Sequence, residues 1–281
     1  MDTLKTRMMQ MDATVTDKSS RGDDLIAACI RIAPGLGLFI LVLVLWEAVI
    51  HLLNVSIFIL PAPSNIAAAL VANAGILAGA TLVTAKEVLV GFALAVIVGI
   101  ALALLIVRFR LFGRALYPLI VLFQTVPKVA LAPIFILWFG YDLAPKVILI
   151  MVIAFFPVTL DMLSGLQSVE QSFVSLMRSV GARENDILLR VRIPHALPHL
   201  MAGMKVAITF SVIGAIVGEF AGASAGLGYL IQFASTQLDT AMVFAALVIV
   251  SVVGVIFYYL IELLERVLIP WAPKFDAVNR A

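Results

Sequence analysis

The sequence predicts an all-α polytopic membrane protein with about six transmembrane helices and both termini in the cytoplasm. Of its 281 residues, 63% are hydrophobic and only 13% are charged, and the mean hydropathy is +1.14. A soluble domain is about half apolar and a quarter charged. This composition excludes a disordered chain and almost any soluble enzyme, because so much apolar surface cannot be hidden in a soluble core. A single cysteine, Cys29, excludes an intrachain disulfide.

The spans are predicted by the length of the apolar stretches, since a helix needs about 20 residues to cross the hydrocarbon core. The six stretches lie at about 32–53, 83–107, 115–139, 144–166, 200–220 and 241–268. The first follows about 30 polar residues, and no small-residue cleavage site comes after it, so we expect a retained anchor rather than a signal peptide. The predicted organisation is a tail over 1–30, a membrane domain over 31–270 and a second tail over 271–281.

The orientation is predicted by the basic residues. Fifteen of the 19 Lys and Arg residues lie before the first span, at the carboxyl end from Arg266 onward, in the loop between spans two and three, or in the loop between spans four and five. The loops Asn54–Thr81 and Ala221–Thr240 contain none. The positive-inside rule therefore places both termini and both Arg-rich loops in the cytoplasm.

The longest of these loops, over residues 167–198, has a helical pattern. Leu176, Val180, Ile187, Leu188 and Val191 alternate with the charged residues Arg178, Arg183, Glu184 and Asp186. The pattern predicts two short amphipathic helices broken at Gly181, with Pro194 and Pro198 ending the segment before the fifth span. By periodicity alone, a helix lying on the membrane surface fits equally well.

The residues of this loop resemble the cytoplasmic loop of permease subunits in ATP-binding-cassette (ABC) importers. That family pattern is E-A-A, three residues, G, nine residues, I-x-L-P. Here Ser175-Leu-Met177 stands at the E-A-A positions, Gly181 at the glycine and Val191-Arg-Ile-Pro194 at the last motif. The glycine, the proline and their spacing match, but the acidic residue is missing. The segments Leu60–Ser64, Phe123–Pro133, Ile136–Gly140, Gly218–Gly222 and Gly226–Ile231 are also similar to the branch that carries nitrate, taurine, alkanesulfonates, bicarbonate, pyrimidine precursors and riboflavin.

The resemblance implies an inner-membrane permease that pairs with a second copy of itself, two cytoplasmic ABC ATPase subunits and a substrate-binding protein. ATP and Mg²⁺ would be used by the ATPase, since this chain has no phosphate loop, and the chain itself is expected to bind no cofactor and no nucleic acid. Lipid would surround it. The coupling loop would dock on the ATPase, with Leu176, Met177 and Val180 as apolar contacts. The loop residues implied are Ser175, Leu176, Met177, Arg178, Val180, Gly181, Ala182, Ile193 and Pro194.

Charged residues at membrane depth are candidates for function, because they are costly there. They are Glu47, Lys86, Glu87, Lys128, Asp161, Lys205 and Glu219. We expect Lys205 to snorkel and Lys86 and Glu87 to be anchors at the outer surface. Pro127 and Pro133 interrupt the third span, which frees backbone groups beside Lys128. The candidate pathway residues are Gln124, Thr125, Lys128 and Glu219, although Lys128 could instead pair with Glu219 or Asp161.

A ladder of glycines follows the fifth span at spacing four: Gly214, Gly218, Gly222 and Gly226. Small residues at this spacing let helices pack closely, and a sliding surface is the alternative. The histidines His51, His195 and His199 have no metal-ligand spacing, so no metal site is expected. The sequence fits two other classes of membrane protein less well. The sequence contains none of the motifs of a membrane enzyme. An ATP-independent secondary transporter would usually show internal repeats, which this sequence does not show.

Overall fold

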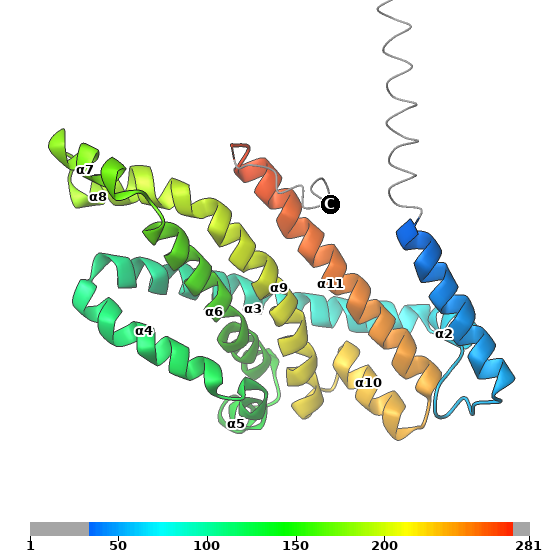
Figure 1. Ribbon diagram of the computed structural model, residues 1–281. Helices are drawn as coiled ribbons and strands as arrows, with labels where there is room; N and C mark the ends of the chain where they lie inside the picture. The colour runs from blue at the N-terminus through cyan, green and yellow to red at the C-terminus, as the bar shows by residue number, and fades with distance from the viewer. Residues whose placement is uncertain (1–33, 272–281) are drawn as a thin grey trace, which may run out of the picture. The chain divides into compact units, whose positions relative to one another are not determined.

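The computed structural model describes residues 34–271, and the regular structure within that range is helical (Figure 1). Five segments there are long and apolar enough to cross a bilayer: Pro34–Leu52, α3 (Ala74–Arg108), α6 (Leu143–Gln167), the continuous stretch Glu184–Gly222 and α11 (Thr240–Leu268). They confirm five of the six predicted spans. The tails predicted over 1–30 and 271–281 lie outside the described residues, apart from Trp271.

The remaining span, predicted over 115–139, is two helices rather than one. α4 (Arg110–Thr125) ends before Pro127, and a 3-10 turn, η1 (Lys128–Leu131), leads into α5 (Ala132–Phe139). Proline has no N–H to donate and disfavours a helical residue before it. Val126 accordingly has extended backbone angles, with φ −69° and ψ 128°. The prolines thus break this span where the sequence predicts an interruption.

The chain divides into two compact units, Met1–Ala67 and Ala68–Ala281. In the first unit, the helix Pro34–Leu52 carries Glu47, one of the predicted intramembrane charges. Its carboxylate accepts hydrogen bonds from the Ser64 backbone N–H at 3.1 Å and from the Ser64 hydroxyl at 2.7 Å, and His51 lies 3.0 Å away. Ser64 lies in the first turn of α2 (Pro63–Ala72), so the acid satisfies one of the free N–H groups at a helix start.

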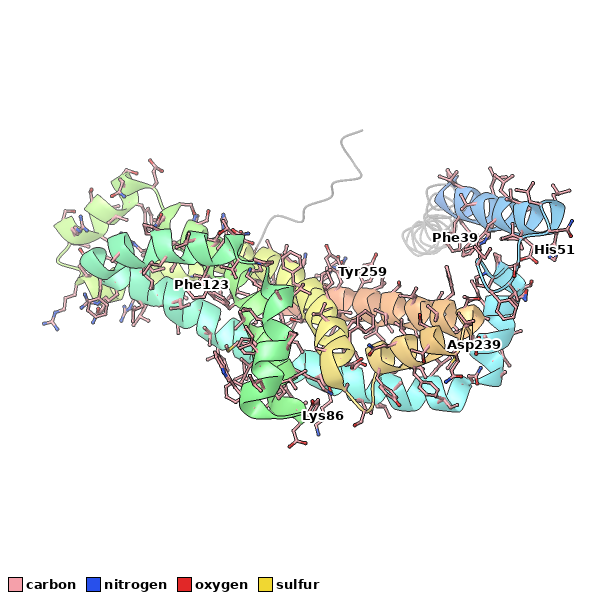
Figure 2. All side chains as sticks on the ribbon, turned by 90° about the horizontal axis from the view of Figure 1, so that it is seen from below. Phe39, His51, Lys86, Phe123, Asp239 and Tyr259 are labelled. Carbon is pink, nitrogen blue, oxygen red and sulfur yellow. The ribbon has the colours of Figure 1, made fainter. Side chains whose placement is uncertain are left out.

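The core of the second unit is built by α6, which packs against α3 on one side and α9 (Ile193–Gly222) on the other. Small residues make the approach close: a Cβ added at Gly99 of α3 would lie 2.7 Å from Val158 of α6. Figure 1 shows α6 and α9 side by side, with α11 along the other edge of α9. Side chains such as Tyr259 on α11 and Phe123 on α4 are exposed (Figure 2), as expected of helices that face lipid.

The two ends of this bundle differ. At the end we call the loop end, α7 (Gln171–Ser179) and α8 (Glu184–Ile187) follow α6, and a π-helical segment, η2 (Leu188–Arg192), joins α8 to α9. At the opposite end, which we call the turn end, α10 (Leu227–Thr236) lies between α9 and α11. This ten-residue helix is not among the predicted elements, because so short an apolar stretch gives no span signal.

The prediction that Pro194 and Pro198 end the loop segment is wrong. Both residues lie inside α9, which continues α8 through η2 without a break. The π-helical turns of η2 are wider than α-helical turns. They leave room for the Pro194 ring, which would otherwise clash with the preceding turn. The fifth predicted span is therefore the outer part of one long helix.

Candidate functional site

The helix α7 is ended by Gly181 in a defined way. The Gly181 N–H donates to the Arg178 carbonyl and the Ala182 N–H donates to the Met177 carbonyl, each at 3.0 Å. This pair of bonds is a Schellman motif, which needs a left-handed residue just past the helix. Gly181 supplies it with φ +83°. The break predicted at Gly181 is confirmed, and two short helices flank it.

The loop has a small core of its own and an exposed apolar face. Val169, Val174 and Ile187 are buried, and Met177, Ala182 and Val191 pack against them. Leu176 is 59% exposed and Val180 is 72% exposed. Phe173 is also exposed, and its spacing of three and seven residues places it on the same helix face. Met177, expected to be an apolar contact beside Leu176 and Val180, is half-buried against the loop core. Phe173, which the sequence analysis did not single out, is 51% exposed.

Arg178 is paired within the loop. Its guanidinium lies 2.8 Å from the Glu184 carboxylate, so α7 and α8 are linked across the Gly181 turn. Both side chains are about half exposed. Ser175, at the position where the family pattern has an acid, is exposed. Ile193 and Pro194 are half-buried in the first turn of α9.

The predicted pathway residues fall in two places. Gln124 and Thr125 are exposed at the end of α4, and the Lys128 ammonium lies 5.5 Å from the centre of the Phe156 ring on α6. Glu219 lies at a different height along α6. Its neighbour Gly218 packs against Lys146, which precedes Phe156 on α6 by ten residues. Ten helical residues correspond to about 15 Å. Among the described residues, no ion pair joins Lys128 to Glu219 or Asp161.

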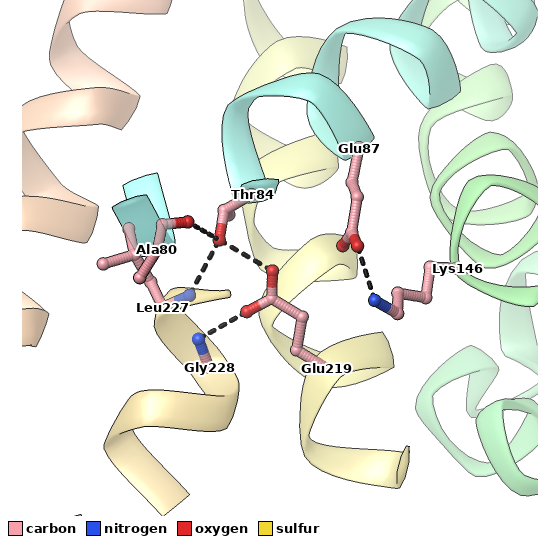
Figure 3. A network of polar contacts seen from close by, with 7 residues as sticks. All are labelled: Ala80, Thr84, Glu87, Lys146, Glu219, Leu227 and Gly228. Atoms are coloured by element: carbon pink, nitrogen blue, oxygen red, sulfur yellow. Dashed lines mark hydrogen bonds and ion pairs between the residues drawn. The ribbon is translucent and has the colours of Figure 1, made fainter. Parts of the chain in front are cut away.

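Glu219 instead joins a buried polar cluster at the turn end (Figure 3). Its side chain is 0% exposed. One carboxylate oxygen accepts a hydrogen bond from the Thr84 hydroxyl of α3 at 2.7 Å, and the other accepts one from the Gly228 N–H. The Thr84 oxygen in turn accepts the Leu227 N–H at 2.8 Å. Three helices, α3, α9 and α10, therefore meet at one carboxylate.

A buried ion pair completes this cluster. The Lys146 ammonium of α6 lies 2.5 Å from one Glu87 oxygen of α3, and Glu87 is 2% exposed. The expectation that Glu87 is a surface anchor is wrong. The signal that could have found it is a stripe of small residues on α3, Gly91, Ala95 and Gly99, which shares the buried face with Thr84 and Glu87. Lys86, one position along, is exposed (Figure 2).

The glycine ladder faces α6 and its preceding loop. Added Cβ atoms would lie 3.2 Å from Ile150 at Gly214, 3.4 Å from Lys146 at Gly218 and 3.0 Å from Tyr141 at Gly222. The helix ends at Gly222, so Gly226 is not on the ladder and instead begins the turn into α10 with φ +113°. Lys205, expected to snorkel, forms an ion pair with Glu265 of α11 at 2.6 Å.

Comparison with known proteins identifies the family. Residues 95–269 match the family described as "binding-protein-dependent transport system inner membrane component". The chain belongs to this family. It is a multi-pass inner-membrane protein and a permease subunit of an ABC importer. Nothing in these comparisons supports an ATP-independent carrier.

Several permeases named for the solute they transport are similar over most of their length. The formylaminopyrimidine transport permease of Halalkalibacterium halodurans is 36% identical over 84% of this chain and 94% of its own. The riboflavin transport permease of Chloroflexus aurantiacus is 35% identical over 85% of this chain and 91% of its own. The putative aliphatic sulfonates permease of Bacillus subtilis is 30% identical over 86% of this chain and 88% of its own.

Solved structures show the same fold. A chain of an inward-facing methionine ABC transporter superposes with a TM-score of 0.61, at 16% identity, over 68% of this permease and 95% of its own length.

Proposed function

We propose that this permease works as a pair with a second copy of itself, bound to two cytoplasmic ABC ATPase subunits and fed by a substrate-binding protein. Family membership supports this assembly, because the family is named for transport that depends on a binding protein. ATP and Mg²⁺ act in the ATPase subunits, and this chain holds no cofactor. The loop end faces the cytoplasm, in agreement with its arginines.

The exposed face of α7 is the proposed contact with the ATPase. Phe173, Leu176 and Val180 form an apolar strip on a short helix that is fixed from behind by Val174 and Ile187. Such a strip on a solvent-exposed loop fits a groove on a partner, in the manner of a helix docked by spaced apolar anchors. The Arg178–Glu184 pair holds the two loop helices together, so motion of the docked helix reaches α8 and α9.

The test compares two exposed leucines. Leu176→Glu should abolish co-purification of the ATPase and the solute-stimulated ATP hydrolysis of the complex, because a carboxylate would be buried in an apolar groove. Leu189→Glu is the matched control, since Leu189 is exposed on η2, away from the strip. A Leu176→Glu complex with normal ATP hydrolysis would exclude α7 as the docking helix.

For the solute, we infer a small organic molecule that carries a planar ring or an anionic group. The similar permeases named above are described as transporting a formylaminopyrimidine, riboflavin and aliphatic sulfonates. At the break of the third span, Gln124, Thr125 and Lys128 combine amide, hydroxyl and ammonium groups, and Lys128 lies over an aromatic ring. These groups suit hydrogen bonding to a heterocycle or pairing with an anion.

Uptake into proteoliposomes would separate these solutes. We expect Lys128→Gln to reduce uptake of an alkanesulfonate more than uptake of a neutral pyrimidine, because only the sulfonate loses a charge partner. Lys86→Gln is the control, as Lys86 is exposed on α3 and outside the cluster. Unchanged uptake of both solutes in Lys128→Gln would remove Lys128 from the pathway.

A further inference from the structure

Two backbone N–H groups at the start of α10 depend on side chains from other helices. Leu227 and Gly228 are the first residues of α10, and the first N–H groups of a helix have no partner within it. The Leu227 N–H donates to Thr84 of α3 and the Gly228 N–H donates to Glu219 of α9. The Thr84 hydroxyl, which donates to Glu219, connects these two bonds.

The turn fits closely around the Glu219 carboxylate. A Cβ added at Gly226 would collide with the carboxylate, and one added at Gly228 would lie 2.9 Å from the Glu219 Cβ. Gly226 also has φ +113° and ψ 171°, a conformation that is essentially restricted to glycine. Both carboxylate oxygens are already bonded within the protein and the side chain is fully buried. Because the carboxylate is buried, neither oxygen is accessible to a solute in this structure.

We propose that Glu219 and Thr84 are positioning residues that pin the start of α10 to α3, so that α3, α9 and α10 move as one block during transport. The proposal rests on the proposed function for its second half, because only transport requires the bundle to move. It replaces the expectation that Glu219 lines the pathway.

The contact that Glu219 makes with α10 and α3 is connected to the coupling loop, because α9 continues α8 without a break. Glu184–Gly222 is one helical stretch of 39 residues, with α8 of the coupling loop at one end and Glu219 at the other. At about 1.5 Å per residue it is roughly 58 Å long. A displacement of α8 by the ATPase is carried along this helix, and the pin transfers it to α10 and α3.

Hydrogen exchange at single-residue resolution tests the pin without any partner protein. In the wild-type permease, the Leu227 and Gly228 amides should be protected. Glu219→Ala should speed exchange of the Gly228 amide about tenfold or more, and Thr84→Val should do the same for Leu227. Thr81→Val is the matched control, because Thr81 bonds only to the Leu77 carbonyl of its own helix. Unchanged protection in both Glu219→Ala and Thr84→Val would overturn the proposal.

Glu219→Gln separates positioning from charge. The glutamine oxygen can accept the Gly228 N–H, and its amide can donate to Thr84, whose hydroxyl then turns to the Ala80 carbonyl at 3.2 Å. We expect protection and uptake within about twofold of wild type in Glu219→Gln, and loss of uptake in Glu219→Ala. Loss of uptake in Glu219→Gln with protection retained would show that the charge itself acts on transport. Failure of the wild-type chain to bind an ATPase would instead count against the proposed function, and the exchange results would stand.

Discussion

The loop end and the turn end of the bundle use charge in opposite ways. At the loop end, Arg178 and Glu184 pair in solvent, and beside them Leu176 and Val180 lie exposed without a neighbour that covers them. At the turn end, Glu87, Lys146 and Glu219 are buried among tightly packed helices. An exposed apolar strip is suited to binding a partner, whereas a buried polar cluster fixes helices to one another. The comparison supports the proposals that the loop end docks on a partner and that the turn end holds helices together.

The largest effect should come from breaking the buried pair at the turn end. Lys146→Met leaves the Glu87 carboxylate buried without a cation and should destabilise the protein by about 3–5 kcal/mol. Thermal unfolding in detergent measures the loss. The control at the other end is Arg266→Met, because the Arg266 side chain is 71% exposed and its ion pair with Glu262 is expected to contribute about 0–1 kcal/mol. The double variant Glu87→Leu, Lys146→Met should recover most of the lost stability. Similar falls in melting temperature for Lys146→Met and Arg266→Met would contradict the difference between the two ends.

The next effect concerns the small core of the loop. Ile187 is fully buried there, and Ile187→Ala should cost about 2–5 kcal/mol of local stability. Faster proteolysis of the segment 171–191 would report it, with the membrane helices unaffected. Leu189→Ala, at an exposed position two residues later, should change the rate little. If the two variants were cleaved equally fast, α7 and α8 would have no core of their own.

Gly181 and Gly226, two of the three described glycines with positive φ, give a third, smaller difference. Asparagine tolerates positive φ better than most residues, and a Cβ at Gly181 meets nothing within 4 Å. Gly181→Asn should therefore be nearly neutral in thermal unfolding. Gly226→Asn should cost about 1–3 kcal/mol, because a side chain there displaces the Glu219 carboxylate. Equal melting temperatures for the two variants would mean that the turn end is not closely packed.

The smallest expected effect is that of the exposed pair in the loop. Arg178→Ala should lower the stability of α7 by about 0.2–1 kcal/mol, and the difference should shrink in about 1 M salt, where screening acts within roughly 3 Å. Hydrogen exchange across α7 at low and high salt measures this. Arg190→Ala is the control, because the Arg190 nitrogen lies 4.0 Å from the Asp186 carboxylate, beyond the 2.8 Å hydrogen bond that Arg178 makes with Glu184. A loss independent of salt would indicate that Arg178 packs rather than pairs.

The sequence could predict the spans and the loop because their signals are local. Twenty apolar residues in a row, or a glycine between two amphipathic segments, need no knowledge of distant residues. The break at Pro127 and the left-handed Gly181 were predictable for the same reason. The contribution of α10 was not, because its apolar stretch is short and its first N–H groups are satisfied by α3 and α9.

The buried cluster could not be predicted because its partners are far apart in the chain. Thr84 and Glu219 are separated by 135 residues, and Glu87 and Lys146 by 59. Lys86 and Glu87 are adjacent, and consecutive residues on a helix point in different directions. The small residues Gly91, Ala95 and Gly99 mark the buried face on which Glu87 lies, but they do not identify Lys146 as its partner. The partners became evident only when α3, α6 and α9 were placed together.

The wide separation of Glu87 and Lys146 in the chain has a consequence for biogenesis. During synthesis α3 leaves the ribosome before α6, so it enters the bilayer carrying a carboxylate whose ammonium partner has not yet been made. Inserting an acidic side chain into lipid is unfavourable by about 2.5–3.5 kcal/mol at the centre of a helix. Among the five described spans, α3 contains the most apolar segment. The helix that must wait for its partner is thus the one whose composition best compensates for an unpaired acid.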